Sequence, residues 1–248
     1  MAQLVKLEDY VSRYEVNLYH YQSRFVALKK RRFKEGEDQR DSISSKIFDH
    51  QLKWASSTVK EFSTLDPSYL SDKALHFLCT KIPDNYFLFY KPSVRHKAAP
   101  VELEVVLAGP REIWCIALLE GKDVIYQENS KHFWNKANEG ANDKKIVSPY
   151  IALERMDFVL NPYLEYFKNR LQLKKAVLCQ NGYVDTQTKR NDVVVIDKRT
   201  FDSWYTRVAG VPSPPKSHQL KFVDLLLKAS LTKSILRREW EDSRGLKD

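Results

Sequence analysis

The sequence predicts an α/β fold in which a mixed sheet is flanked by helices, with a helical N-terminal arm and a C-terminal helix. Short β-branched and aromatic runs alternate with helix-forming segments in the middle of the chain. Apolar residues at helical spacing dominate the start of the chain and recur after a proline-rich stretch. We therefore divide the chain into a coiled-coil-like helical arm (residues 1–66), an α/β domain (67–210), a linker (211–218) and a basic amphipathic helix (219–248).

Heptad spacing predicts the helical arm. Two series of apolar residues repeat every seven positions, with the offset of a coiled-coil seam. The series are Leu4, Val11, Leu18 and Phe25, and Leu7, Tyr14, Tyr21 and Leu28. After a polar break at residues 35–41, a second helix is expected to end before Asp66-Pro67. Two helices with a short loop favour an antiparallel hairpin within the chain. The alternative is that the seam forms a homo-oligomer or binds a partner protein.

Turn signals and short apolar runs predict the elements of the α/β domain. Two helices are expected, one near residues 70–78 and one beginning at Ser148-Pro149, where serine is a favourable N-cap and proline fits the first turn. Strands are expected at residues 86–90, 103–108, 113–119, 176–179 and 193–196. Gly109-Pro110 forms the turn between the second and third of these strands.

The C-terminal helix is predicted by apolar residues spaced three or four positions apart. They are Leu220, Val223, Leu227, Leu231 and Ile235. The prolines of the preceding linker cannot continue a helix. We expect this helix either to dock on the core or to bind a partner protein.

The sequence excludes several classes of site. It has no GxGxxG, P-loop or HExxH pattern, so dinucleotide, P-loop nucleotide and zinc-protease sites are not expected. Its three cysteines are far apart, which excludes a disulfide framework and suits a reducing compartment. The longest apolar run has seven residues and the first residues resemble no secretory leader. We therefore expect a cytoplasmic protein with no membrane partner.

The net charge of +9 is concentrated in two basic arms at the ends of the chain. Residues 1–34 carry a net charge of +5 and residues 216–248 carry +3, which leaves +1 for the middle. The strongest cluster, KKRRFK, holds the candidate nucleic-acid-binding residues Lys29, Lys30, Arg31, Arg32 and Lys34. The alternative is a solvated helix end, where the helix dipole favours cations. Any contact with DNA is expected through these arms.

Residues 101–134 carry a more specific pattern. The segment VELEVVLAGPREIWCIALLEGKDVIYQENSKHFW resembles the nuclease-related domain (NERD) family of the PD-(D/E)xK restriction-endonuclease-like superfamily. The resemblance lies in the order of hydrophobic strands, the Gly-Pro turn and the tryptophan that follows, and it extends over about residues 68–200. It implies a bacterial protein with a restriction-endonuclease-like sheet. In active members, carboxylates bind a divalent metal such as Mg²⁺ or Mn²⁺ that activates water.

The polar positions of that family fall on other residue types in this chain. The first acid corresponds to Glu104, and the Glu-x-Lys motif corresponds, without a gap, to Ala117 and Leu119. A glutamine common in the family corresponds to Ala152. Alanine and leucine can neither bind a metal nor stabilise a developing charge. The resemblance thus implies a degenerate nuclease without a metal cofactor, which acts as a nucleic-acid-binding or protein-interaction subunit.

A literal Glu-x-Lys motif lies three residues further along. Glu120, Gly121 and Lys122 could form a migrated active site together with Glu104. In this alternative, Glu104, Glu120 and Lys122 are catalytic, and Mg²⁺ or Mn²⁺ binds Glu104, Glu120 and Asp72 for cleavage of DNA. The shift inverts the facing of the strand, so a bulge would have to compensate. The opposing interpretation is a polar turn between strands, which the glycine favours.

Overall fold

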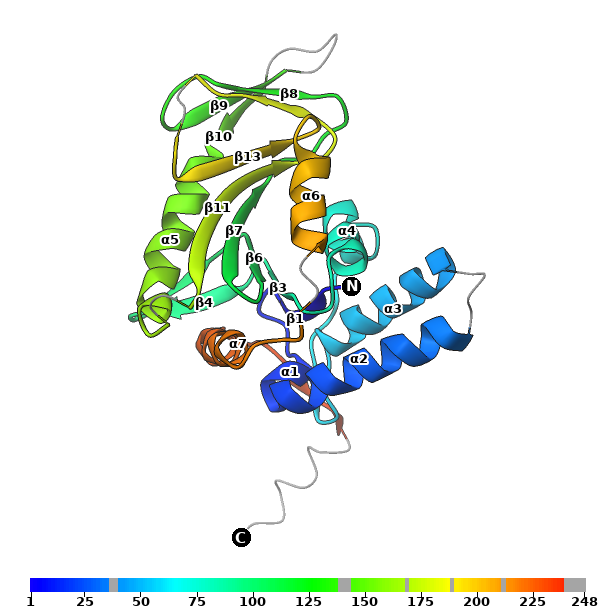
Figure 1. Ribbon diagram of the computed structural model, residues 1–248. Coiled ribbons are helices and arrows are strands. Elements are labelled where there is room, and N and C mark those ends of the chain that lie inside the picture. Colours follow the sequence, from blue (N-terminus) through cyan, green and yellow to red (C-terminus); the bar gives the residue numbers. More distant parts are fainter. Residues whose placement is uncertain (36–39, 138–143, 168–169, 188–189, 211–212, 239–248) are drawn as a thin grey trace.

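A six-stranded mixed sheet forms the centre of the fold (Figure 1). The computed structural model describes residues 1–35, 40–137, 144–167, 170–187, 190–210 and 213–238. The strand order of the six-stranded sheet is β1-β3-β6-β7-β11-β13. The bounds are β1 Gln3–Leu7, β3 Phe87–Tyr90, β6 Val105–Ala108, β7 Glu112–Leu118, β11 Gln172–Cys179 and β13 Val193–Asp197. The meander β3-β6-β7 is antiparallel, whereas β1 pairs with β3, and β11 with both β7 and β13, in parallel. The predicted mixed α/β class is therefore confirmed.

Helices cover both faces of this sheet. The described α-helices are α1 Arg13–Val16, α2 Leu18–Glu35, α3 Arg40–Trp54, α4 Lys73–Lys81, α5 Pro149–Glu165, α6 Phe201–Ala209 and α7 Ser217–Ala229. The face carrying Val106 and Cys115 packs against α5 and α7, and the face carrying Leu107 and Trp114 packs against α4 and α6. None of the described helices combines the length and apolar character that a membrane span requires.

Smaller sheets flank the main one. A four-stranded sheet in the order β10-β9-β8-β12 lies above the main sheet in Figure 1. Its strands are β8 Ile125–Glu128, β9 Phe133–Ala137, β10 Lys144–Val147 and β12 Tyr183–Asp185. Two antiparallel pairs complete the described strands: β4 Ser93–His96 with β5 Ala99–Glu102, and β2 Glu61–Phe62 with β14 Ile235–Leu236. A 3₁₀ turn, Pro67–Leu70, precedes α4.

The first strand corrects the expected helical arm. Leu4 and Leu7, predicted to begin the coiled-coil seam, lie instead in β1, at the edge of the main sheet. Every residue of β1 is buried, and a short apolar run does not by itself distinguish a buried strand from a buried helix. The N–H of Leu4 donates to the side chain of Gln51 on α3 at 2.8 Å, which satisfies this backbone donor at the sheet edge. Helical structure begins only after Ser12, which forms a capping box with Glu15.

The rest of the seam packs inside the chain. α2 and α3 lie side by side as a hairpin (Figure 1). The seam residues Tyr14, Leu18 and Phe25 are buried in the hydrophobic cluster that also contains α5 and α7, and Tyr21 and Leu28 pack against it. These side chains therefore already have intramolecular partners, as the hairpin interpretation expects.

Two helices are shorter than predicted. α3 ends at Trp54 and α7 at Ala229. Beyond each end a serine, Ser56 or Ser230, donates its hydroxyl at 2.8 Å to the carbonyl four residues earlier, and such contacts favour helix ends. The chain then becomes extended in both places, and β2 pairs with β14. Residues 239–248 of the predicted C-terminal helix, and residues 211–212 of the linker, lie outside the described residues.

Candidate functional site

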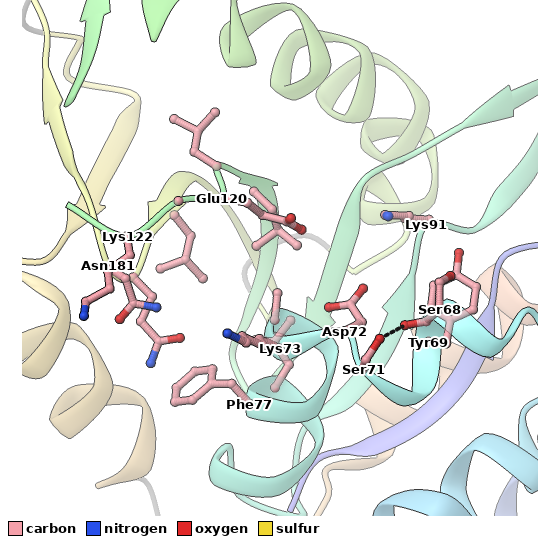
Figure 2. A pocket seen from close by; sticks show the side chains of 17 residues that line it. Ser68, Tyr69, Ser71, Asp72, Lys73, Phe77, Lys91, Glu120, Lys122 and Asn181 are labelled. Carbon is pink, nitrogen blue, oxygen red and sulfur yellow. Dashed lines mark hydrogen bonds between the residues drawn. The ribbon is translucent and has the colours of Figure 1, made fainter. Parts of the chain in front are cut away.

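Two adjoining cavities lie at the edge of the main sheet where β3 and β7 end and β6 begins. The α4 cavity, of about 530 Å³, is lined among others by Asp72, Lys73, Lys91, Glu120, Lys122 and Asn181 (Figure 2). The β9 cavity, of about 300 Å³, is lined among others by Lys91, Glu104, Leu119, Glu120, Lys136 and Lys144. The two cavities share Lys91, Leu118, Leu119 and Glu120. Each residue proposed for a migrated active site therefore lines at least one of them.

Asp72 caps α4 and is held on both of its carboxylate oxygens. Oδ1 accepts the backbone N–H of Leu75 at 2.9 Å, and Oδ2 accepts the hydroxyl of Tyr90 at 2.7 Å. Burial raises the pKa of Tyr90, and the hydrogen bond to Asp72 raises it further, so this phenol stays protonated at neutral pH. These contacts fix the start of α4 against the end of β3.

Glu104 stands immediately before β6, and its carbonyl accepts the N–H of Lys91 at 2.8 Å. The ladder between β6 and β7 pairs Val105 with Ile116. Glu104 itself precedes the first pair of this ladder, and it lines the β9 cavity. Leu103 belongs to the hydrophobic cluster of the α5 face, as Val106 does, so the alternation of faces within β6 does not extend back to Glu104.

The positions where the NERD family is polar come together on one side of the sheet. Ala117 is 3% exposed and belongs to the hydrophobic cluster of the α5 face. Leu119 and Ala152 pack against the same cluster from the end of β7 and from α5. All three degenerate positions therefore belong to, or pack against, the hydrophobic cluster on this side of the sheet.

Glu120, Gly121 and Lys122 lie in the turn that follows β7 rather than on the strand itself. The carbonyl of Glu120 accepts the hydroxyl of Tyr126 at 2.6 Å and the ammonium of Lys136 at 3.0 Å. The side chains of Glu120 and Lys122 are exposed, and in Figure 2 they leave the turn in different directions. In an active site, the two-residue spacing puts the Glu and Lys side chains on one face of a strand. In this turn, Glu120 and Lys122 do not share such a face.

Replacing Gly121 with alanine should destabilise this turn. Gly121 has a φ of +153°, and an added Cβ would lie 2.5 Å from Cγ2 of Val124. We expect the free energy of unfolding to fall by about 1–3 kcal/mol, the usual cost of a residue forced into such a conformation. Urea denaturation measures this, with Lys122→Ala as the control, because that exposed side chain should change stability by less than about 0.5 kcal/mol. Equal stabilities of the two variants would contradict the prediction.

The donor set does not fit the metal centre that the resemblance implies for active members. Within the described ranges, no three His, Cys, Asp or Glu side chains are placed to hold a metal ion. The contacts of Asp72 agree with this, because both of its carboxylate oxygens are engaged, by Leu75 and Tyr90. We therefore derive no reaction step through a metal.

The basic cluster of α2 lies outside both cavities. Lys29 forms an ion pair with Asp84, which connects α2 to the turn before β3. The other cluster residues, Lys30, Arg31, Arg32 and Lys34, are exposed in the last turns of α2. This cluster is a separate basic surface of the α2–α3 hairpin.

Four cavity lysines were not among the residues predicted from the sequence: Lys73, Lys91, Lys136 and Lys144. The ammonium of Lys91 lies 5.3 Å from the ring centroid of Tyr90, and that of Lys136 lies 5.6 Å from the ring of Tyr126. Such cation–π contacts hold the two charges at the cavity walls. Its position directly after a predicted strand was the one sequence signal that could have identified Lys91. Its place beside Glu104 depends on the pairing of the strands.

Comparison of the chain with models of protein families, with curated proteins and with solved structures gave no match.

Proposed function

We propose that this protein is a NERD-like, nuclease-related protein of the bacterial cytoplasm that binds nucleic acid without cleaving it. The observation that carries the proposal is the buried Ala117, near the end of β7, at the position where the ungapped alignment with the family puts a metal-binding glutamate. On that alignment, one metal ligand of a phosphodiester-binding site is replaced by a methyl group.

The charges around the two cavities support phosphate as the ligand. Five lysines line them, Lys73, Lys91, Lys122, Lys136 and Lys144, against the carboxylates of Asp72, Glu104 and Glu120. Lysines that neutralise phosphates provide most of the sequence-independent affinity for nucleic acids. The exposed α2 cluster supplies a second basic surface that a longer nucleic acid could reach.

The proposed location rests on the cysteines. Cys79, Cys115 and Cys179 are free and buried. Burial raises the pKa of the Cys179 thiol to about 11, so it remains a protonated, unreactive thiol at neutral pH. Buried free thiols suit a reducing compartment such as the cytoplasm.

Neutralising cavity lysines should weaken binding and reduce its dependence on salt. We expect the triple variant Lys91→Ala, Lys136→Ala, Lys144→Ala to bind a fluorescent oligonucleotide at least tenfold more weakly at 100 mM salt. The slope of log K against log salt should become shallower by about 0.7–0.9 for each phosphate that the variant no longer neutralises. Fluorescence anisotropy across a salt series measures both quantities. An unchanged slope would contradict phosphate binding in the cavities.

The matched control is neutralisation of the α2 cluster, with Lys30→Ala, Arg32→Ala and Lys34→Ala in one variant. It removes the same number of charges from a surface outside both cavities. An equal loss of affinity in the two variants would indicate binding by net charge alone. Loss only in the control would assign the contact to the hairpin instead of the cavities.

A cleavage assay tests the loss of hydrolysis. Supercoiled plasmid incubated with the protein and Mg²⁺ or Mn²⁺ is expected to remain uncut. Cleavage that both Glu120→Ala and Lys122→Ala abolish would contradict the proposal. That result would establish the alternative, a metal-dependent DNase using Glu104, Glu120 and Lys122.

A further inference from the structure

The four-stranded sheet has one face turned away from the hydrophobic core. Trp134 of β9 and Tyr126 of β8 point to the core and are 0% and 2% exposed. Because side chains alternate along a strand, their neighbours point outward. The outer face consists of Ile125 and Gln127 of β8, Phe133, Asn135 and Ala137 of β9, Lys145 and Val147 of β10, and Tyr183 and Asp185 of β12.

Large apolar side chains are exposed on this outer face. Phe133 is 40% exposed, Ile125 is 37% exposed and Val147 is 62% exposed. The register places Val147 directly opposite Phe133 on the neighbouring strand. Phe133 and Val147 therefore form an exposed apolar pair at one end of the face, a feature that an interaction surface can use.

Cations lie over both aromatic rings of the face. The Lys145 ammonium is 4.1 Å from the ring centroid of Phe133. At the other edge, Lys198 and Arg199 lie 5.5 and 5.7 Å from the ring centroid of Tyr183. At Tyr183 the two cations are also paired with acids, Lys198 with Asp123 and Arg199 with Asp185 and Asp197. At Phe133, the Lys145 ammonium can meet a phosphate while the ring stacks on a base.

The charges of the face favour an anionic ligand. At its outward positions, β8, β9 and β10 carry no carboxylate within the described residues. The one outward carboxylate of β12, Asp185, is paired with Arg199 at 3.3 Å. Between the rings, Asn135 and Gln127 face each other across β9 and β8, and their amides can donate to and accept from base edges.

The spacing of the rings suits an extended strand of nucleotides. Tyr183 pairs with Ile125 on β8, and Ile125 pairs with Ala137 on β9, so Tyr183 lies two strands, about 10 Å, to the side of Ala137. Phe133 lies four residues, about 13 Å, from Ala137 along β9. A single strand can cross such a surface with its bases turned toward the sheet, whereas stacked duplex bases cannot reach the rings.

We propose that this outer face binds single-stranded nucleic acid, with one base stacked on Phe133, where Lys145 can meet the neighbouring backbone phosphate, and another stacked on Tyr183. The inference rests on the proposed function for the choice of nucleic acid as ligand. It adds the single-stranded form and a surface distinct from the two cavities, because the β9 cavity is lined by Tyr126 and Lys136 on the other side of this sheet and the outer face contributes to neither cavity.

The test compares aromatic variants of the full-length protein. A fluorescent 12-nucleotide oligothymidylate and the matching duplex serve as probes in anisotropy titrations. Phe133→Ala should weaken binding of the single strand about five- to hundredfold, the range of base stacking on one aromatic side chain, whereas Phe133→Tyr should retain it. Phe158→Ala is the matched control, because Phe158 is also exposed (63%) and also has a lysine, Lys97, over its ring at 5.9 Å, but lies on α5.

The outcomes separate this inference from the proposed function. A selective loss for Phe133→Ala with no loss for Phe158→Ala supports the inference. Unchanged binding by Phe133→Ala, or tighter binding of the duplex than of the single strand by the parent protein, overturns it. If either of these results is found and the variant with Lys91, Lys136 and Lys144 replaced by alanine still loses affinity, the proposed function stands and only the role of the outer face is rejected. No binding of either probe by the parent protein overturns both.

Discussion

Replacing Glu15 with glutamine is expected to lower the free energy of unfolding by about 3–5 kcal/mol, the usual cost of leaving one member of a buried ion pair without its partner. The partner is Lys6 of β1, whose side chain is 0% exposed and pairs with the Glu15 carboxylate. The Lys6 ammonium also donates to the carbonyl of Tyr10 and to the hydroxyl of Thr232, at 2.8 and 2.7 Å. Glutamine preserves the capping box of α1, because its side chain can still accept the N–H of Ser12.

The pH dependence of this defect has a defined sign. Burial lowers the pKa of Lys6, and the Glu15 charge opposes that shift. The unfolded chain therefore binds more protons in the alkaline range, and the contribution of Lys6 to stability rises with pH until it is neutral in both states. Loss of the Glu15 charge lowers the folded-state pKa further. The deficit of Glu15→Gln should consequently shrink between pH 7 and pH 10.

Urea denaturation at pH 7 and pH 10 measures both effects. The control is the double variant Lys6→Met, Glu15→Gln, which removes the buried charge together with its partner. It should recover most of the stability that Glu15→Gln loses, because an apolar side chain of similar length can occupy the site. A deficit that is the same at both pH values, or a double variant less stable than Glu15→Gln, would contradict the assignment.

Replacing Trp134 with alanine should cost about 3–5 kcal/mol, as for other large aromatic residues removed from a core. Trp134 is fully buried and makes an edge contact with Tyr150 of α5 at a centroid distance of 5.1 Å. It is the side chain through which β9 joins the hydrophobic cluster of the α5 face. Its loss should therefore loosen the four-stranded sheet from the rest of the fold.

The adjacent residue provides the control for this experiment. Phe133 occupies the opposite face of the same strand and is 40% exposed. Phe133→Ala should lower the free energy of unfolding by less than about 1 kcal/mol. Urea denaturation followed by circular dichroism gives both values. Similar losses for the two variants would mean that the face assignment of β9 is wrong, and would also undermine the proposed stacking role of Phe133.

The α/β core was predictable because its signals are local. The Gly109-Pro110 turn and the apolar runs around it correspond to β6 and β7, and Ser148-Pro149 marks the start of α5. The edge strand β1 was not predictable in this way. QLVKL is buried on both sides, so its apolar residues showed no alternation that would distinguish it from a helix. The heptad match through Leu4 and Leu7 was a coincidence of spacing.

The candidate site was predictable only in part. Asp72, Glu104, Glu120 and Lys122 were named from the sequence, and all four line the two cavities. Their relations were not predictable: the position of Lys91 beside Glu104 depends on the pairing of β3 with β6. The cap that engages Asp72 depends on a tertiary contact with Tyr90. Register and tertiary contacts join residues distant in sequence, which motif spacing does not report.

The pairing of β1 with β3 has a consequence for folding kinetics. Leu4 meets Leu88 across more than eighty residues of chain, and Lys6 meets Thr232 across 226. Contacts between such remote segments form at a large cost in chain entropy, which favours their formation after the local meander β3-β6-β7. The buried environment of the Lys6–Glu15 pair, which these remote contacts create, should then be absent from the folding transition state. Substitutions there would act mainly by accelerating unfolding, so this pair would set the kinetic lifetime of the native state.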